Sequence, residues 1–90
     1  MAADDSEMGT HLAEMLAAKF CALIYRNGRV DGRYEMPVDQ LRKQSEHPAR
    51  VTQAALALAE RRDWIRLGGL GLILTATGLY VAKGVLGLPR

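Results

Sequence analysis

The residues with the most reactive side chains in this sequence are few and scattered. Cys21, His11 and His47 lie far apart in the chain, whereas a zinc site needs several Cys and His ligands gathered together. Ser45-Glu46-His47 has the residue types of a catalytic triad, but sequence neighbours rarely point at one another, so we read it as a turn. Because no Gly-rich phosphate loop or nucleophile elbow is present either, we expect no enzyme, no metal and no cofactor.

Cys21 is the single cysteine, so an internal disulfide is excluded and a reducing, cytoplasmic setting is expected. It falls within a helical apolar pattern, which predicts a buried, unreactive thiol. The sequence begins with an acidic segment and has no basic region ahead of an apolar one, so a secretory signal is not expected.

The charges of this chain are unevenly distributed. Residues 1–14 carry Asp4, Asp5, Glu7 and Glu14 and no Lys or Arg, so all 12 basic residues of the chain lie beyond them. An acidic start followed by a basic body suits a domain that meets an anionic partner. It equally suits a disordered solubilising tail, and both interpretations stay open.

One domain is expected over residues 10–90, preceded by a loose acidic tail over residues 1–9. A first helix of about four turns is predicted from a capping Thr10 to Asn27-Gly28. Its apolar residues recur at steps of three and four and are expected to face inward: Leu12, Met15, Leu16, Phe20, Leu23 and Ile24.

Turn signals and prolines divide the middle of the chain. The segment 27–33 (NGRVDGR) holds two turn dipeptides, and residues 34–36 are long enough to add one rung to a small sheet. Pro37 and Pro48 each suit the start of a helix. A short helix over 37–44, a tight turn and a longer helix over 48–62 form the helix-turn-helix arrangement.

The apolar stretch 63–80 (DWIRLGGLGLILTATGLY) has two interpretations. A membrane span over 67–88 would be marginal, because only sixteen uncharged residues separate Arg66 from Lys83. Two short strands near 64–67 and 72–75, joined across a Gly-rich turn, account for more of the detail. Thr75 or Thr77 would then cap a last helix, so the hairpin is favoured.

The segment 54–82 resembles the second half of winged helix domains. The matching features are Asp63-Trp64-Ile65 opening a strand, a glycine-bearing wing at Gly68, Gly69 and Gly71, and Leu72-Ile73-Leu74-Thr75-Ala76-Thr77-Gly78 entering the last helix. The resemblance implies a mostly α fold with a small antiparallel β wing (α+β), a winged helix-turn-helix. Asp63 departs from the usual Gly, and Leu70 occupies a wing tip where a basic residue is common.

The helix over 48–62 can be oriented in two ways, since Leu56 and Leu58 point to nearly opposite sides. One orientation buries Val51, Ala55, Leu58 and Arg62. The other, which the resemblance favours, buries Thr52, Ala55, Leu56 and Ala59 and exposes Arg50, Gln53, Ala54, Ala57 and Arg61. In the second, Arg50, Gln53 and Arg61 would reach base edges, and Arg42, Lys43 and His47 would touch phosphates.

The sequence therefore predicts a double-stranded DNA-binding protein, a transcriptional regulator acting as a homodimer through its first and last helices. A winged helix adaptor that binds protein instead of DNA is the first alternative. A small membrane protein anchored by residues 67–88 is the second.

Overall fold

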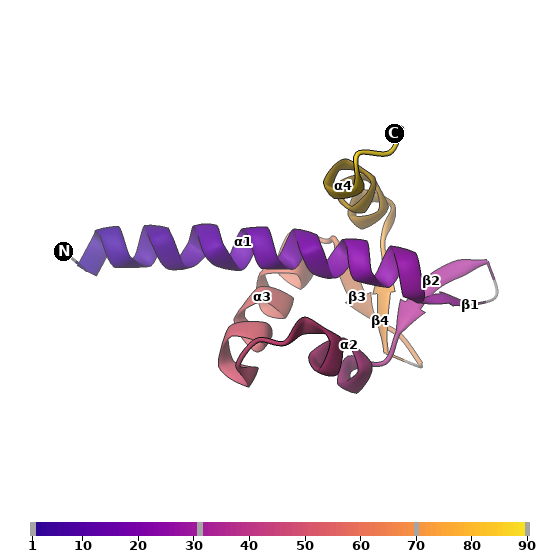
Figure 1. Cartoon of the computed structure of the whole chain (residues 1–90), viewed down its shortest axis with the longest axis horizontal. Coiled ribbons are helices and arrows are strands. Elements are labelled where there is room, and N and C mark those ends of the chain that lie inside the picture. Colours follow the sequence, from indigo (N-terminus) through magenta and orange to yellow (C-terminus); the bar gives the residue numbers. More distant parts are fainter. Residues whose placement is uncertain (1, 31, 70, 90) are drawn as a thin grey trace.

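A computed structural model of the chain contains four helices and four strands among its described residues (Figure 1). The structure describes the backbone of every residue except Met1, Asp31, Leu70 and Arg90, and the side chains of residues 11–29, 32–69 and 71–89. In chain order the elements are α1 (Ala2–Asn27), β1 (Arg29–Val30), β2 (Arg33–Met36), α2 (Val38–Ser45), α3 (Ala49–Arg61), β3 (Ile65–Leu67), β4 (Leu72–Leu74) and α4 (Ala76–Leu86).

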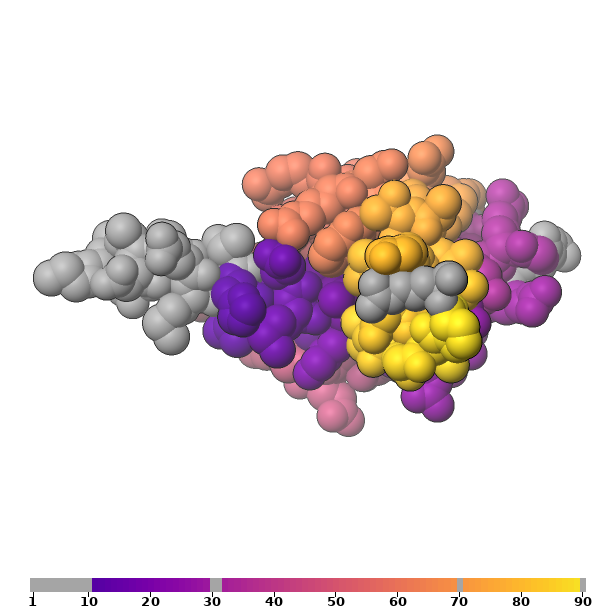
Figure 2. All heavy atoms as spheres, turned by 90° about the horizontal axis from the view of Figure 1, so that it is seen from above, coloured from indigo at the N-terminus to yellow at the C-terminus, as the bar shows by residue number. Residues whose placement is uncertain are grey.

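Helix α1 runs through the middle of the molecule. Figure 1 shows α4 on one side of it and α2, α3 and the strands on the other, with the N-terminal turns of α1 projecting past α3. From above, α4 crosses the later turns of α1 and leaves earlier turns uncovered (Figure 2). The helix ends at Asn27 as predicted, but its expected start at Thr10 is wrong, because α1 begins at Ala2. The proposed looseness of residues 1–9 in the free protein stays a prediction.

The turn region after α1 forms a hairpin that the sequence analysis did not resolve. Strand β1 pairs with β2 antiparallel, with Arg29 opposite Tyr34. Gly32, in the connecting turn, has a φ of +81°, a conformation that glycine adopts without strain. The Tyr25 and Tyr34 rings, 5.0 Å apart between centroids, join the end of α1 to β2.

The stretch 63–80 forms the predicted hairpin and the start of the last helix. Strands β3 and β4 pair antiparallel, and β4 also pairs with β2, so the sheet order is β1-β2-β4-β3. The rung predicted at residues 34–36 is thus confirmed. The alternative of a single helix spanning 67–88 is wrong, because these residues divide between strands and the 11-residue α4. Within the described residues no helix has the length and apolar content that a membrane crossing requires.

The core lies where α1 meets the sheet, α3 and α4. Its largest fully buried side chains are Phe20, Ile24, Met36, Leu41 and Ile65. Small residues let the helices approach, since Ala17, Ala55, Ala59 and Ala82 are all completely buried. Two of the six residues expected to face inward on the first helix do not do so, because Leu12 and Met15 are 62% and 48% exposed.

The architecture is therefore mostly helical with a small antiparallel sheet, an α+β fold as predicted. A helix, a strand, a helix-turn-helix and a β hairpin follow one another along the chain, and the earlier strand pairs with the hairpin. This order is compatible with a winged helix.

Candidate nucleic-acid interface

Helix α3 buries one face and leaves the other in solvent. Thr52, Ala55 and Ala59 are buried, whereas Val51 and Arg62, which the first orientation would bury, are exposed. The second of the two predicted orientations is thus the one observed. The observed face differs from the predicted one at two residues: Leu58 is buried, and Leu56 is only half-buried because it packs at the edge of the core.

The exposed face of α3 has cations at both ends and small side chains between. Arg50, Ala54, Ala57 and Arg61 fall within a narrow sector of the helix, and Gln53 lies at its edge. Arg50 and Arg61 are separated by about 16 Å along the axis, at about 1.5 Å per residue. Neither arginine forms an ion pair within the described part of the chain, so both guanidinium groups are available to a ligand.

The turn before α3 is held by two hydroxyl groups. Ser45 Oγ lies 3.3 Å from Thr52 Oγ1, with both residues buried, and it also donates to the Arg42 carbonyl oxygen at 3.0 Å. The His47 N–H donates to the same Ser45 oxygen at 3.4 Å. Glu46 takes the left-handed conformation there, with φ of +58°. Ser45-Glu46-His47 is therefore a turn, as predicted, and it fixes the angle between α2 and α3.

The six candidate DNA-contacting residues are all exposed, but they do not form one cluster. Arg50, Gln53 and Arg61 share the outer face of α3. Arg42 and Lys43 lie in the last turn of α2, where cations also interact favourably with the helix dipole. His47 lines a hollow against α1, next to Lys19 and Leu16. The assignment of these six residues to DNA stays a prediction.

Acidic residues reduce the positive charge of this surface. The segment from α2 to Arg62 has five Lys and Arg residues against Asp39, Glu46 and Glu60. Glu60 is exposed on α3 and lies near Gln53 around the helix, so its carboxylate borders the candidate face. The surface is therefore only moderately basic, and its cations are concentrated at the ends of α3 and on α2.

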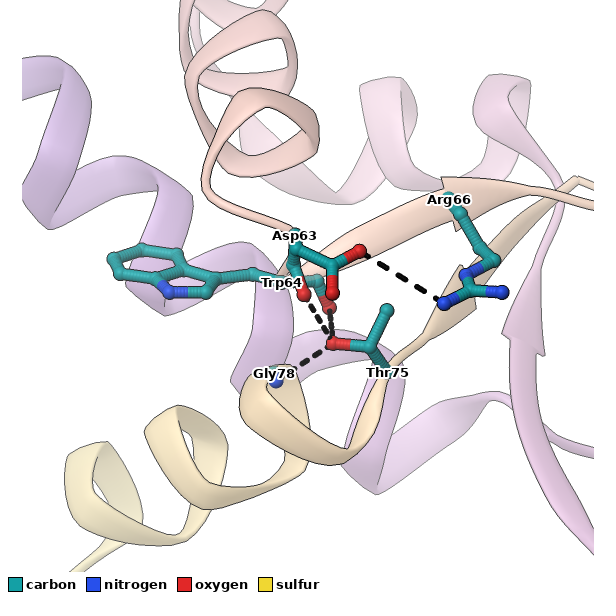
Figure 3. Close-up of polar contacts among 5 residues, drawn as sticks. All are labelled: Asp63, Trp64, Arg66, Thr75 and Gly78. Carbon is teal, nitrogen blue, oxygen red and sulfur yellow. Dashed lines mark hydrogen bonds and ion pairs between the residues drawn. The ribbon is translucent and has the colours of Figure 1, made fainter.

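The end of α3 is joined tightly to the β3–β4 hairpin and to α4, and this junction positions the hairpin (Figure 3). The Trp64 N–H donates to the Ala59 carbonyl and the Asp63 N–H to that of Glu60, which is the hydrogen-bond pattern of a Schellman cap. Such a cap requires a left-handed residue, and Asp63 supplies it with φ of +60°. The departure from Gly at this position is thus accommodated at the cost of backbone strain.

Thr75 connects the two sides of this junction. Its hydroxyl accepts a hydrogen bond from the Gly78 N–H at 3.0 Å and lies within donating distance of the Asp63 and Trp64 carbonyl oxygens (Figure 3). Thr75 is therefore the cap of α4, one of the two candidates predicted. Gly78 is buried against the Trp64 carbonyl, where an added Cβ would lie 1.9 Å from that oxygen.

Two charged contacts that sequence reasoning missed also position these elements. Arg62 pairs with Glu14 of α1 at 3.1 Å and lies over the Trp64 ring, 5.7 Å from its centroid. Glu35 of β2 is buried, with Arg33 3.5 Å from its carboxylate. Neither contact has a periodic signal in the sequence. The Arg62–Glu14 pair joins elements that are distant in the chain, and the Arg33–Glu35 pair lies within a four-residue strand.

Cys21 is buried in α1, as predicted. Burial raises the pKa of its thiol to about 12, so the thiolate is strongly disfavoured at neutral pH. Within the described residues, no group of three or more His, Cys, Asp or Glu side chains is placed to hold a metal ion.

Comparison of the chain with family models, with curated proteins and with solved structures finds no match.

Proposed function

We propose that the protein is a winged helix DNA-binding protein that acts in transcription control as a homodimer. In this proposal α3 enters the major groove of duplex DNA, and its exposed face reads base edges. A pair of copies related by a two-fold axis would offer two α3 helices to a palindromic site.

The orientation of α3 is the observation that carries the proposal. Burial of Thr52, Ala55 and Ala59 directs Arg50 and Arg61 to solvent, with Ala54 and Ala57 between them. Small side chains permit a close approach to a groove, arginine pairs with guanine, and glutamine, here Gln53, pairs with adenine. A face with long charged side chains in the middle would not support the same docking.

The phosphate contacts would come from α2. Arg42 and Lys43 are exposed in its last turn, and the Ser45–Thr52 hydrogen bond holds that turn at a fixed position relative to α3. Phosphate contacts orient a protein on DNA without reading sequence. The moderate net charge implies few such contacts, and hence a shallow dependence of affinity on salt.

Fluorescence anisotropy with a labelled random duplex, titrated at several salt concentrations, tests the proposal. Binding at low salt that weakens with a slope of roughly −2 to −4 in log K against log salt would correspond to about two to four phosphates neutralised. A sequence-specific site would then be sought by selection from a randomised duplex pool. Absence of binding at low salt contradicts the proposal.

Single substitutions separate the roles of the basic residues. Arg42→Ala should weaken binding to all sequences and reduce the salt slope by about 1, whereas Arg50→Ala should cost about 1–3 kcal/mol and relax specificity at one base pair. Arg29→Ala, an exposed arginine in β1, is the matched control and should change neither. All three side chains are exposed, so the fold should tolerate their removal.

A protein-binding adaptor is the alternative that a specific observation favours. Ala49, Ala54 and Ala57 of α3 are exposed, and Leu67 in β3 is 67% exposed. These apolar groups would suit a protein surface better than a phosphate backbone. Failure of the duplex titration would leave this function as the better supported one.

A further inference from the structure

A long groove runs beside α1, on the side where α2 ends and α3 begins. Two adjoining hollows make it up, of about 340 and 200 Å³. Both contain Leu16, Lys19 and His47, so they are continuous. Val85 and Leu86 of α4 form one wall of the larger hollow, and Gln44, Ser45 and His47 form the other.

The groove exposes large apolar side chains. Leu12, Met15 and Val51 line the smaller hollow and are 62%, 48% and 41% exposed, and Val85 of the larger hollow is 46% exposed. Isolated exposed apolar residues are ordinary, but these are grouped along one groove. Their exposure and the open length of the groove suit an elongated apolar element better than a small molecule.

The charges beside the groove indicate which element fits. Lys19 and Arg26 are exposed on its rim, and neither is ion-paired within the described part of the chain. Three of the four acidic residues of the same helix lie at the opposite end, at Asp4, Asp5 and Glu7, and the fourth, Glu14, pairs with Arg62. Helix α1 is therefore divided into an acidic beginning and a basic end.

The spacing of α1 supplies a seam for pairing. Alternating steps of three and four residues place side chains on one side of a helix. In α1 such a series runs through positions 5, 8, 12, 15, 19, 22 and 26. The seam is apolar at Met8, Leu12 and Met15 and basic at Lys19 and Arg26. A parallel pair would set like charges together at both ends, whereas an antiparallel pair would set unlike charges together.

We propose that the groove holds α1 of a second copy of this chain, running antiparallel. In register, Leu12 of each copy lies opposite Met15 of the other and Met8 opposite Lys19. Asp5 then falls opposite Ala22, between the basic positions 19 and 26. The proposal gives the partner and its direction, and it does not depend on whether the protein binds DNA.

Sedimentation equilibrium of the full chain, without DNA, tests the interface first. The wild type should be a dimer, and Leu12→Glu with Met15→Glu should raise the dissociation constant at least 100-fold. The matched control is Leu67→Glu, an equally exposed leucine on β3, which should leave the dimer unchanged. Circular dichroism checks that each variant remains folded. A monomeric wild type at 100 μM (about 1 mg/ml) overturns the proposal.

Charge exchange tests the electrostatic part. Chains carrying Lys19→Glu with Arg26→Glu, or Asp4→Lys with Asp5→Lys, should each self-associate at least 10-fold more weakly than the wild type. An equimolar mixture of the two should regain dimers, because unlike charges then face each other again. If neither pair of substitutions changes self-association, the charge complementarity is wrong.

Disulfide cross-linking tests the direction. The chain with both Met8→Cys and Lys19→Cys should oxidise to a covalent dimer, whereas the chain with either substitution alone should not. In the proposed register, position 8 of one copy lies about 16 Å along the helix axis from position 8 of the other copy. The native Cys21 is fully buried and does not interfere. Efficient cross-linking of either single variant indicates a parallel pair and overturns the proposal.

Discussion

The junction between α3, the β3–β4 hairpin and α4 differs sharply from the groove beside α1. At the junction, the Thr75 hydroxyl forms hydrogen bonds with the backbone of Asp63, Trp64 and Gly78, and Gly78 brings α4 against the Trp64 backbone just before β3. Beside α1, in contrast, Leu12 and Met15 are 62% and 48% exposed, and Lys19 has no ion-pair partner among the described residues.

The single chain therefore depends on the residues of the junction more than on those of the groove. The junction fixes elements that are distant in sequence, so substitutions there should reduce the free energy of unfolding directly. The groove contains apolar surface that the single chain leaves unused, so substitutions there should act through a partner. The following predictions test this division at the junction and in the core.

The largest effect is expected at Gly78. Gly78→Ala would place a Cβ 1.9 Å from the Trp64 carbonyl oxygen, and the obstacle is backbone that cannot easily move. We expect a loss of about 3 kcal/mol or more in the free energy of unfolding, measured by urea titration. Gly69→Ala is the control, since nothing lies within 4 Å of its added Cβ, and it should be nearly neutral. If Gly78→Ala and Gly69→Ala changed the free energy of unfolding equally, the close contact at the junction would not be what stabilises the chain.

The second effect concerns the Thr75 hydroxyl. Thr75→Val keeps the shape of the side chain but leaves the Gly78 N–H without its cap, and it should cost about 1–2 kcal/mol of unfolding free energy. Thr75→Ser retains the hydroxyl and should stay within about 0.5 kcal/mol of the wild type. Thermal and urea unfolding followed by circular dichroism would measure both. If Thr75→Val left the free energy of unfolding unchanged, water would be replacing the hydroxyl as the cap of α4.

The third effect is a pH dependence from Cys21. Its pKa is raised to about 12 in the folded chain, so above pH 9 the unfolded thiol ionises while the folded one does not. Stability should therefore fall as pH rises through this range, by about 1 kcal/mol at pH 10. The comparison is with Cys21→Ala, which should lose that part of the alkaline dependence. Rapid reaction of the native thiol with a disulfide reagent at pH 8 would contradict this burial.

The smallest effect, and a favourable one, is expected at Asp63. With φ of +60° this residue is strained, and Asp63→Gly should stabilise the fold by about 0.5 kcal/mol. The lost ion pair with Arg66, 3.8 Å apart and exposed, is worth little. Asp63→Ala is the informative control, because it also removes the ion pair but keeps a Cβ. A stabilising Asp63→Ala would assign the gain to charge instead of strain.

Much of the fold could be predicted from residues that interrupt regular structure. Pro37, Pro48 and Thr75 each mark a helix start that the structure has within one residue, and the glycines near position 70 separate β3 from β4. The strand at 34–36 was predicted as well, because a two-stranded hairpin requires a third strand to be stable.

The wrong predictions on α1 have a common physical cause. Periodicity shows where a helix face is apolar, but it does not show how far the neighbouring elements cover that face. Leu12 and Met15 continue the apolar stripe of α1, but they line an open hollow bordered by Val51 of α3, so they are exposed. The early turns of α1 lack such a stripe, and the helix start at Ala2 was therefore missed. Strand β1, with two residues, is too short for any periodic signal.

The candidate interface was predicted in part. Periodicity left two orientations of α3 open, and the resemblance to winged helix domains favoured the one that buries Thr52, Ala55 and Ala59, as observed. The Ser45–Thr52 hydrogen bond and the Arg62–Glu14 ion pair did not follow, because each depends on a tertiary arrangement that spacing alone does not reveal.

The central position of α1 has a consequence for how the molecule opens. This one helix contacts all the other helices and strands β1, β2 and β4, and Ala17, Cys21 and Ile24 are completely buried on it. A local fluctuation cannot expose their amides without dismantling the core around them. Hydrogen exchange at these three positions should therefore report the free energy of global unfolding.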